Sequence, residues 1–558
     1  MTTIIFLVIL MFMLFLKLLT QGLLLVHRLQ QLGYSDLKLV KWLEGRQYRE
    51  ILLWNIFELL LPLLIILLLY YNIKQIPIYK YITSTIMLLT FAWKLVHPFT
   101  AKWVGRKAYV KVPLVYTSRV KRLIATLIVV IIFTLFFVFI FTVLPLDTFT
   151  LSTWRFFRFN AFLLFISVIT PVMILISNLI ISPVEALVHY GYFNKAKNKL
   201  KRVKTKNIGI TGSYGKTSTK YFLAKILEEK YKVLFTPASY NTPMGISKII
   251  NQNDLDDIEL FIAEMGADKS GDINTLCRLV NPTFGIISAI DIQHLETFGT
   301  SENIINTKLS LFKNLPSDGF GIYNYDSPLL LDNINRFEYK CRLFSYSMNE
   351  INTDKVDIIA KDIKHTRDGL VFKAVLKDSI SIDIKAAVLG RHNTLNLLAA
   401  ILMANKMGLS AKEIENGINK IEPVEHRLQM IKAPSGVLIL DDAFNSNLNG
   451  ATEALRVLNE IEGNKKVIIT PGMIGLGEKE EEINKIFGNN IAKFADIAIL
   501  VGKEKTRSIY DGIIEGGLDK DNLIVTSSLE EAKDELKHIL TAGDIVLFEN
   551  DLPDTYNE

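Results

Sequence analysis

The N-terminal third of this chain is dominated by apolar segments long enough to cross a lipid bilayer. About five such segments occur, each near the 20 or so helical residues that a span requires. Backbone N–H and C=O groups in hydrocarbon must be paired internally, so uninterrupted apolar stretches of this length fold as helices. An α-helical membrane domain is therefore expected over residues 1–190, with approximate spans Thr3–Val26, Ile51–Tyr71, Tyr81–Val96, Leu123–Leu146 and Ala161–Ile181.

Lysine and arginine gather after the first, third and fifth apolar segments. The last of these runs reads as a basic juxtamembrane linker at residues 191–206. Since basic loops stay in the cytoplasm, the pattern predicts a multi-pass protein of the cell membrane with an external N-terminus and a cytoplasmic soluble part. The basic runs are either topology determinants resting on anionic lipid or a surface that captures an anionic lipid-linked substrate.

The composition of the soluble part, from about Lys206 onward, excludes several classes of protein. The formal net charge of the whole chain is +6, too mild and too unevenly spread to indicate nucleic-acid binding. Cys277 and Cys341 are the two cysteines, which makes a disulfide framework improbable and fits a reducing compartment. Their spacing is not that of metal ligands.

Short β-branched runs alternate with helical stretches through the soluble part, which is typical of α/β units on a parallel sheet. A period-two stretch around Val356 to Val388 predicts a small antiparallel sheet, and a second α/β series begins near Val437. The pattern divides the soluble part into domains at 207–424 and 425–558, joined near Pro423 to Arg427. The expected strands are Asn207–Ile210, Leu260–Glu264 and Thr283–Ile287 in the first domain, and Val437–Leu440, Lys466–Ile469, Ile497–Val501 and Ile545–Phe548 in the second.

A glycine-rich turn, TGSYGKTST at Thr211 to Thr219, follows the first of these strands and opens a helix. Such turns aim backbone N–H groups at nucleotide phosphates, Lys216 can reach the terminal phosphates, and the Thr217 hydroxyl can bind Mg²⁺. A full Walker spacing wants glycine at position 210, where this chain has Ile210. The alternative is a plain glycine turn before a helix.

Three further residues qualify as site candidates from their places in the pattern. Glu264 ends a predicted buried strand, at the edge where ligands of open α/β sheets sit, and could hold Mg²⁺ or be a surface acid. His294 follows another strand end and is either a metal ligand or a structural histidine. Lys308 lies on a predicted helix and by itself reads as solvated.

The soluble part contains six motifs in a fixed order: GITGSYGKTSTK, AEMGA, the HLETFG…TK run, LGRHNTLNLLAA, EHRLQ and LDDAFNSN. In order and wording they resemble the Mur ligases, most closely the branch that adds D-alanyl-D-alanine to a UDP-N-acetylmuramoyl-tripeptide. The resemblance covers about Lys206 to Phe548. It implies a P-loop central domain, a Rossmann-like C-terminal domain, and an ATP-dependent amide ligase of cell-envelope synthesis.

The resemblance also implies a magnesium site. Its ligands would be Thr217, Glu264, His294 and Lys308. Lys308 matches a lysine that the family carries as a carbamate, and a carbamate suits this place because its anionic oxygen attracts Mg²⁺ whereas an ammonium repels it. The implied cofactors are thus ATP, Mg²⁺ and a carbamylated Lys308.

The family's nucleotide site is shared between two domains. Asn396 matches an adenine-contacting asparagine, while Arg427 and Asp442 match C-terminal residues that reach the phosphates and the ribose; His426 is a weaker candidate. Closure of the C-terminal domain should complete such a site and exclude water. The implied catalytic residues are Lys216, Lys308, His294 and Arg427, and the implied nucleotide contacts are Gly212, Ser213, Tyr214, Gly215, Lys216, Thr217, Ser218, Asn396, Arg427 and Asp442.

The chain departs from the family in three places. Apolar spans replace the soluble domain that holds the UDP-sugar peptide, so a membrane-held, lipid-linked or polymeric acceptor becomes attractive. Ala289 and Asp291 stand where the family has Asn and Gly, and Asp291 is either an extra metal ligand or a turn residue. The chain ends in GDIVLFENDLPDTYNE, where the branch has a basic ending, so the amine substrate differs or the tail is merely solvated.

We therefore expect a membrane-anchored ligase that forms an acyl phosphate on a carboxylate and joins it to an amino acid or short peptide. Its partners would be membrane lipid, an amine donor and a carboxylate acceptor, with no nucleic acid. Two other classes remain: an ATP-driven transporter or flippase, for which the chain offers no ABC-type motif, and a non-catalytic envelope scaffold, against which the retained Lys216, Glu264, His294 and Lys308 argue.

Overall fold

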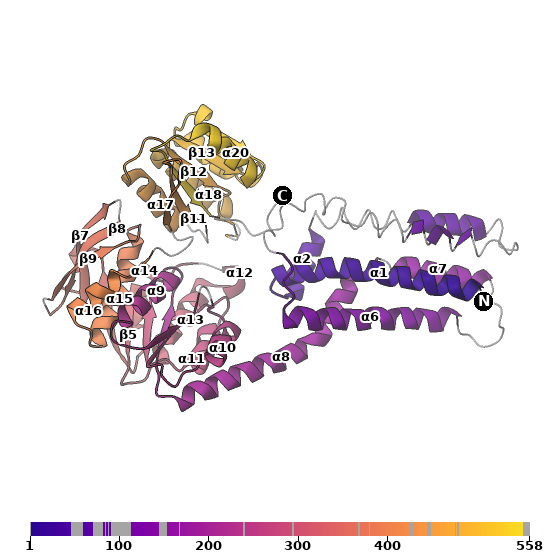
Figure 1. Cartoon of the computed structure of the whole chain (residues 1–558), viewed down its shortest axis with the longest axis horizontal. Helices are drawn as coiled ribbons and strands as arrows, with labels where there is room; N and C mark the ends of the chain where they lie inside the picture. Colours follow the sequence, from indigo (N-terminus) through magenta and orange to yellow (C-terminus); the bar gives the residue numbers. More distant parts are fainter. Residues whose placement is uncertain are drawn as a thin grey trace. The chain divides into compact units, whose positions relative to one another are not determined.

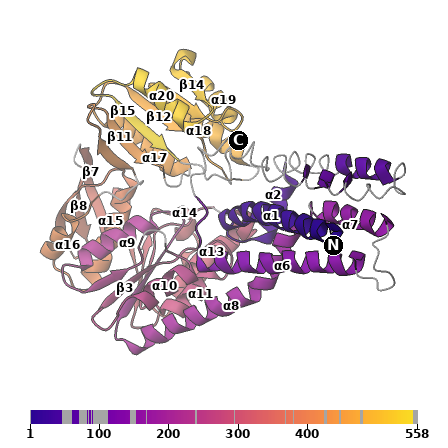
Figure 2. The ribbon, with the colours of Figure 1, turned by 45° about the vertical axis from the view of Figure 1, so that its right-hand side comes forward.

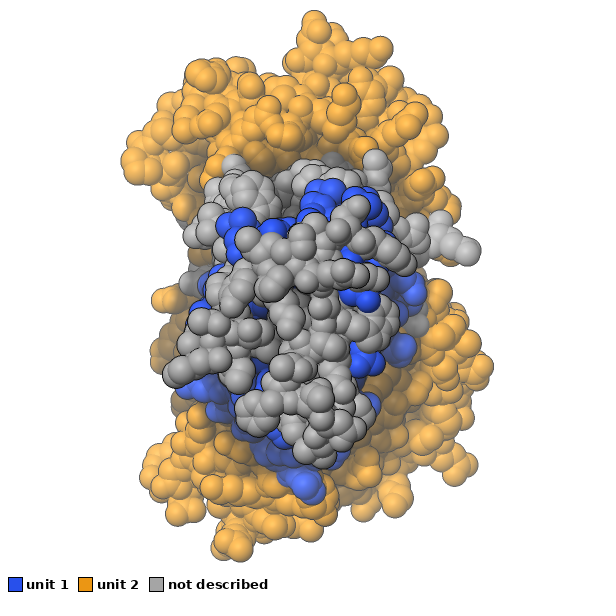
Figure 3. Space-filling view, turned by 90° about the vertical axis from the view of Figure 1, so that its right-hand side faces the viewer, with its two compact units in different colours: residues 1–189, 553–556 blue, residues 190–552, 557–558 orange. Residues whose placement is uncertain are grey.

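The chain divides between His189 and Tyr190 into two compact units, a helical one and an α/β one, in a computed structural model (Figure 3). Each unit is described by itself. The structure describes residues 2–45, 60–70, 82–83, 85–87, 89–90, 113–143, 153–166, 168–237, 240–292, 295–366, 369–378, 380–422, 428–443, 448–474, 476 and 479–550.

The first unit is helical, as the apolar pattern predicts (Figure 1). Within the described residues, three helices are long and apolar enough to cross a membrane by length and composition: Val8–Gln31, Ser118–Ile140 and Thr170–Arg202. A shorter apolar helix covers Leu60–Tyr70. The longer elements here are α1 (Thr2–Gln31), α2 (Asp36–Glu44), α6 (Ser118–Val143), α7 (Thr153–Ile166) and α8 (Thr170–Arg202).

Two of the five expected spans coincide with these helices, namely the first with α1 and the fourth with α6. The fifth, Ala161–Ile181, is not one helix: α7 ends at Ile166, the chain turns, and α8 starts at Thr170. The turn is closed by the N–H of Ile169 donating to the carbonyl of Ile166 at 3.2 Å. Of the second expected span, Leu60–Tyr70 is helical and the rest lies outside the described residues, as does most of the third.

Polar side chains tie the helices of this unit together. The guanidinium of Arg122 on α6 donates to both carboxylate oxygens of Glu185 on α8, at 2.6 and 3.0 Å. Asn178 on α8 donates to the carboxylate of Asp36 at 2.8 Å. Paired in this way, the polar groups can be buried among apolar helices without an uncompensated charge.

Helix α8 is one uninterrupted element that begins apolar and ends basic. Its last turns belong to the second unit, where Ala196 and Leu200 are buried in a hydrophobic cluster with Ile250 and Phe261. Residues 191–202 of the expected basic linker are thus helical. The domain boundaries themselves stay a prediction.

The first sheet of the second unit has strand order β2-β3-β1-β4-β5-β6-β7-β8-β9. The pairs from β2 to β7 are parallel and the last two pairs are antiparallel. The expected antiparallel strands are therefore present, but they extend the parallel sheet. The strands are β1 (Lys206–Thr211), β2 (Val233–Phe235), β3 (Leu260–Glu264), β4 (Phe284–Ile287), β5 (Phe320–Asn324), β6 (Arg342–Ser347), β7 (Ile358–Thr366), β8 (Gly369–Leu376) and β9 (Ser381–Ala386).

Helices cover both faces of this sheet (Figures 1 and 2). Successive strand residues point to opposite faces, so Ile208 and Ile262 pack with α9, α15 and α16, whereas Phe261 and Ala263 pack with α10, α11 and α13. The parallel strands are buried on both sides for this reason. The helices are α9 (Lys216–Leu227), α10 (Pro243–Gln252), α11 (Asp272–Val280), α12 (Leu295–Phe298), α13 (Ser301–Lys313), α14 (Pro328–Leu331), α15 (His392–Lys406) and α16 (Ala411–Ile418).

A second sheet, with order β10-β11-β15-β12-β13-β14, forms the C-terminal α/β part. The β10–β11 pair is antiparallel and the other pairs are parallel. All four expected strands here are confirmed to within two residues. The elements are β10 (Gln429–Lys432), β11 (Leu438–Asp442), α17 (Leu448–Glu460), β12 (Lys466–Thr470), α18 (Glu480–Phe494), β13 (Ile497–Val501), α19 (Arg507–Glu515), β14 (Leu523–Thr526), α20 (Leu529–Ile539) and β15 (Ile545–Glu549).

The burial of α8 predicts a measurable stability effect. Leu200→Ala should destabilise the first sheet by roughly 2–5 kcal/mol, because it removes buried methyl groups and leaves a cavity. Asn198→Ala, on an exposed position of the same turn, is the matched control. Hydrogen exchange of β3 peptides in the full chain in detergent measures the difference; equal exchange in the two variants would show that α8 ends as a free linker.

Candidate active site

The phosphate loop joins β1 to α9 through two glycines with positive φ. Gly212 has φ 155° and Gly215, which caps α9, has φ 79°. A Cβ at Gly215 would lie 2.4 Å from the side-chain oxygen of Asn396, and one at Gly212 would lie 2.0 Å from the Ser288 hydroxyl. Only glycine fits either position, so the loop can bring its N–H groups close to an anion at the start of α9.

Residues 288–291, which follow β4, are hydrogen-bonded to the phosphate loop. Ser213 donates its N–H to the Ala289 carbonyl at 2.8 Å, and its hydroxyl accepts the Asp291 N–H at 2.8 Å. The Ser288 hydroxyl donates to the Tyr214 carbonyl. Residues 288–291 thus fix the shape of the phosphate loop.

Asp291 lies in irregular backbone after β4. Its Oδ1 accepts the N–H of the next residue, Ile292, at 2.8 Å. Its charge contributes, after burial, to raising the pKa of Tyr214. Both interpretations of Asp291, turn residue and metal ligand, stay predictions.

Glu264 ends β3 opposite the phosphate loop, because Ile210 of β1 is in register with it. Its Oε2 accepts the Thr217 hydroxyl at 3.1 Å and the Lys220 ammonium at 2.9 Å, and its Oε1 accepts the Asn241 amide at 3.2 Å. The side chains of Glu264 and Lys220 are each 2% exposed. Thr217 and Lys220 of α9, together with Asn241, therefore form one polar cluster with Glu264 at the end of β3.

Lys216 folds back onto its own loop, where the ammonium donates to the carbonyls of Gly212 at 2.7 Å and Ser213 at 3.2 Å. These are neutral acceptors within the loop, which a phosphate oxygen can replace as a stronger, charge-assisted partner. The position agrees with the predicted role of Lys216 at the terminal phosphates.

Lys308 lies on α13 and is buried. Burial and, to a lesser degree, the neighbouring Lys216 lower the pKa of this lysine to about 7, while Asp268 opposes the shift. A lysine normally titrates near 10.4. A large fraction of Lys308 is therefore the neutral, nucleophilic amine near pH 7, in contrast to the solvated lysine that position alone suggests.

The remaining predicted residues are placed in part. Asn396 on α15 is buried beside the phosphate loop, where its Oδ1 accepts the Thr219 hydroxyl at 3.2 Å. Asp442 ends β11, and its Oδ1 accepts the Leu428 N–H at 3.1 Å. His294, His426 and Arg427, like the last eight residues of the tail, lie outside the described residues. Across the described chain, no group of three or more His, Cys, Asp or Glu side chains could hold a metal ion.

Sequence reasoning missed Lys220 and Asn241, the other partners of Glu264. Lys220 follows Lys216 by four residues, so the two lie one turn apart along α9. Asn241 follows the short strand β2, whose carboxyl end meets the same edge of the sheet as that of β3. A search for polar residues at every strand end and one helical turn past the phosphate loop finds both.

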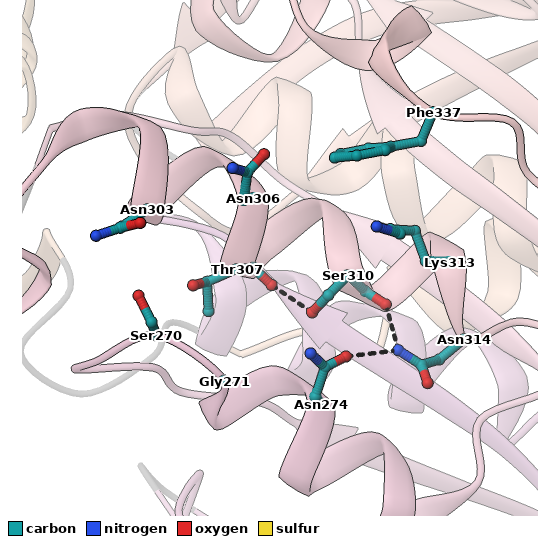
Figure 4. A pocket seen from close by; sticks show the side chains of 10 residues that line it. All are labelled: Ser270, Gly271, Asn274, Asn303, Asn306, Thr307, Ser310, Lys313, Asn314 and Phe337. Atoms are coloured by element: carbon teal, nitrogen blue, oxygen red, sulfur yellow. Dashed lines mark hydrogen bonds between the residues drawn. The ribbon is translucent and has the colours of Figure 1, made fainter.

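A separate polar pocket of about 630 Å³ lies between α11 and α13 (Figure 4). The amide of Asn314 bridges the Asn274 Oδ1 at 2.9 Å and the Ser310 carbonyl at 2.7 Å. No predicted ATP-site residue lines this pocket, whose residues are Ser270, Gly271, Asn274, Asn303, Asn306, Thr307, Ser310, Lys313, Asn314 and Phe337.

Known proteins share both α/β parts. The Mur ligase middle domain matches residues 210–404, and the Mur ligase glutamate ligase domain matches residues 426–549. The UDP-N-acetylmuramoyl-tripeptide–D-alanyl-D-alanine ligase of Bacillus subtilis is 28% identical over 354 residues, 63% of this chain and 74% of that protein. The Escherichia coli enzyme of the same name is 29% identical over 345 residues, 61% of this chain and 75% of that protein.

Solved structures agree on the fold. A crystal structure of MurF from Acinetobacter baumannii has a TM-score of 0.58 at 21% identity, covering 66% of this chain and 78% of that one. MurF from Thermotoga maritima in complex with ADP has a TM-score of 0.56 at 23% identity, covering 66% and 81%.

The phosphate loop on a helix-covered sheet, followed by a second α/β sheet, defines a nucleotide-dependent enzyme. The two matched domains together cover more than half of the chain, and they identify the family to which this enzyme belongs. The chain belongs to the Mur ligase family, and it is an ATP-dependent acid–amino-acid ligase of the kind that serves peptidoglycan-type synthesis.

The glycine geometry predicts the effect of a single methyl group. Gly215→Ala should weaken ATP binding at least about tenfold, because its Cβ collides with Asn396 and the backbone has a positive φ. Gly517 also has a positive φ, 93°, but no atom lies within 4 Å of an added Cβ. Gly517→Ala therefore has the backbone strain of Gly215→Ala without its steric clash. Fluorescence titration with a labelled ATP compares them, and equal affinities would refute the role of the close approach.

Proposed function

We propose that this ligase works at the membrane and joins an amino acid or short peptide to a carboxylate on a membrane-associated acceptor. The observation that carries the proposal is helix α8, which starts as an apolar span and ends buried in the core of the ATP-binding sheet. A catalytic domain built onto such a helix is held near the bilayer. The basic runs support a cytoplasmic position for it and an external N-terminus.

The reaction follows from the charges of the site. The acceptor carboxylate attacks the γ-phosphorus of ATP, ADP leaves, and an acyl phosphate forms; the amine then attacks the acyl carbon, phosphate leaves, and an amide remains. Lys216 is positioned to neutralise charge on the transferred phosphoryl group. Arg427, which lies outside the described residues, is proposed to assist it from the C-terminal domain, with Asp442 at the ribose.

Magnesium fits the donors present. The Glu264 carboxylate and the Thr217 hydroxyl are hard oxygen ligands, and their 3.1 Å contact leaves both with free lone pairs. His294 and a carbamylated Lys308 are proposed to complete the metal's protein ligands. Bound Mg²⁺ would supply charge neutralisation at the phosphates.

Carbamylation suits the state of Lys308. The neutral amine attacks CO₂ at carbon, a C–N bond forms, and one proton is released to solvent, which leaves an anionic carbamate. Burial, which makes an ammonium costly here, favours the neutral amine that this step needs. The product also turns two neighbouring cations, Lys216 and Lys308, into a favourable pair.

Phosphate release by the full chain in detergent tests the proposal. Release should require an amine and a carboxylate together, because the amine must discharge the acyl phosphate. A lipid-linked carboxylate should be used in preference to the soluble UDP-linked one. ATP turnover that is insensitive to every amine and coupled to lipid movement would instead support a transporter.

Lys308→Ala should lower kcat by on the order of 10²–10³, since it removes an anionic ligand from the site. Short carboxylates such as formate or acetate should restore part of the rate, because they can occupy the space of the lost carbamate. Lys313→Ala, at an exposed position of the same helix, is the control and should keep its activity. Full activity of Lys308→Ala would refute the carbamate.

The pKa of Lys308 predicts how the rate of carbamylation depends on pH. The amine is neutral above its pKa of about 7, so reactivation of CO₂-depleted enzyme at a constant concentration of dissolved CO₂ should speed up with rising pH and level off soon above 7. Rates that keep rising to about pH 10 would indicate an ordinary solvated lysine.

A further inference from the structure

The buried ion pair between Lys220 and Glu264 has no assigned role in the reaction. The ammonium of Lys220 lies 2.9 Å from Oε2 of Glu264, and both side chains are 2% exposed. Removing two charges from water is costly, and apolar residues of similar size often stabilise a fold as well or better. A charged pair at this depth therefore points to a requirement other than stability.

The geometry around Glu264 shows what Lys220 does to the carboxylate. Lys220 and Thr217 both donate to Oε2, at 2.9 and 3.1 Å. Oε1 accepts the Asn241 amide at the longer distance of 3.2 Å, its one hydrogen bond within the described part of the chain. Two donors on one oxygen fix the plane of the carboxylate and leave the second oxygen less occupied, as a ligand for a cation.

Charge leads to the same conclusion. A buried carboxylate needs a compensating partner, and the Lys220 ammonium in contact with Oε2 supplies one. Lys220 lies on α9 directly after the phosphate loop. The helix that carries Lys216 therefore also carries the residue that orients the Glu264 carboxylate.

We propose that Lys220 is a positioning residue that orients the Glu264 carboxylate, so that Oε1 is left for the cation that accompanies ATP. This inference rests on the proposed magnesium role of Glu264. Lys220 acts through Glu264 and touches neither the nucleotide nor the metal. Its loss should therefore affect the contribution of Mg²⁺ to ATP binding and leave binding of the free nucleotide nearly unchanged.

The test is ATP binding to the full chain in detergent, measured with Mg²⁺ and with EDTA. The variants are Lys220→Met, which keeps the length and loses the donor, and Lys220→Gln, whose amide is one atom too short to reach Oε2 in the same place. In both, the affinity gained on adding Mg²⁺ should fall by about tenfold or more, while affinity in EDTA changes by less than about threefold. Lys225→Met is the matched control, since Lys225 pairs with Glu228 at the partly exposed side of the same helix.

A double variant tests whether Lys220 acts through Glu264. Lys220→Met combined with Glu264→Gln should bind Mg²⁺ and ATP no worse than Glu264→Gln alone, because the two residues act as one unit. Additive losses would overturn the inference, as would equal losses in Mg²⁺ and EDTA, which indicate a general structural role. If Mg²⁺ does not raise the ATP affinity of the unchanged protein, the proposed magnesium site is wrong. If Mg²⁺ raises the affinity of the unchanged protein and of both variants by the same factor, only the proposed role of Lys220 is wrong.

Discussion

The buried carboxylate of Glu264 is the group on which the rest of the active site depends. It brings together Thr217 and Lys220 from the helix after β1 and Asn241 from the loop after β2. The parallel register of β1 with β3 places all of these groups at one edge of the sheet. A buried anion must be compensated, so each partner is constrained by the same charge. The phosphate loop is thereby attached to the sheet at a fixed point.

Two lysines act on each other on the other side of the site. Lys216 donates to neutral carbonyls of its own loop, and its charge adds to burial in lowering the pKa of Lys308. Phosphate oxygens would offer Lys216 a charged partner, and the neutral amine that burial favours is the form that the proposed carbamylation needs. Local rigidity comes from residues 288–291, whose bonds to Ser213 and Tyr214 hold the loop in shape.

The helical unit contains helices that are long and apolar enough to cross a membrane by length and composition. The ion pair of Arg122 with Glu185 connects α6 to α8 within that unit. Helix α8 then continues until Leu200 is packed against the ATP-binding sheet. An apolar segment and a part of the catalytic core therefore belong to one continuous helix, and this continuity underlies the proposal of a membrane-held acceptor.

The sequence by itself determined the helical N-terminal third, the two α/β parts and the phosphate loop, because hydrophobic period and glycine spacing are local properties. Motif order pointed to the Mur ligases and to Glu264, Asn396 and Lys308. Local patterns could not predict the break between α7 and α8, the continuation of one sheet into β7–β9, or the partners of Glu264. Those depend on which distant segments pack together. Only burial in the tertiary structure lowers the pKa of Lys308 to about 7 and pairs Lys220 with Glu264, because desolvation is a property of the whole fold.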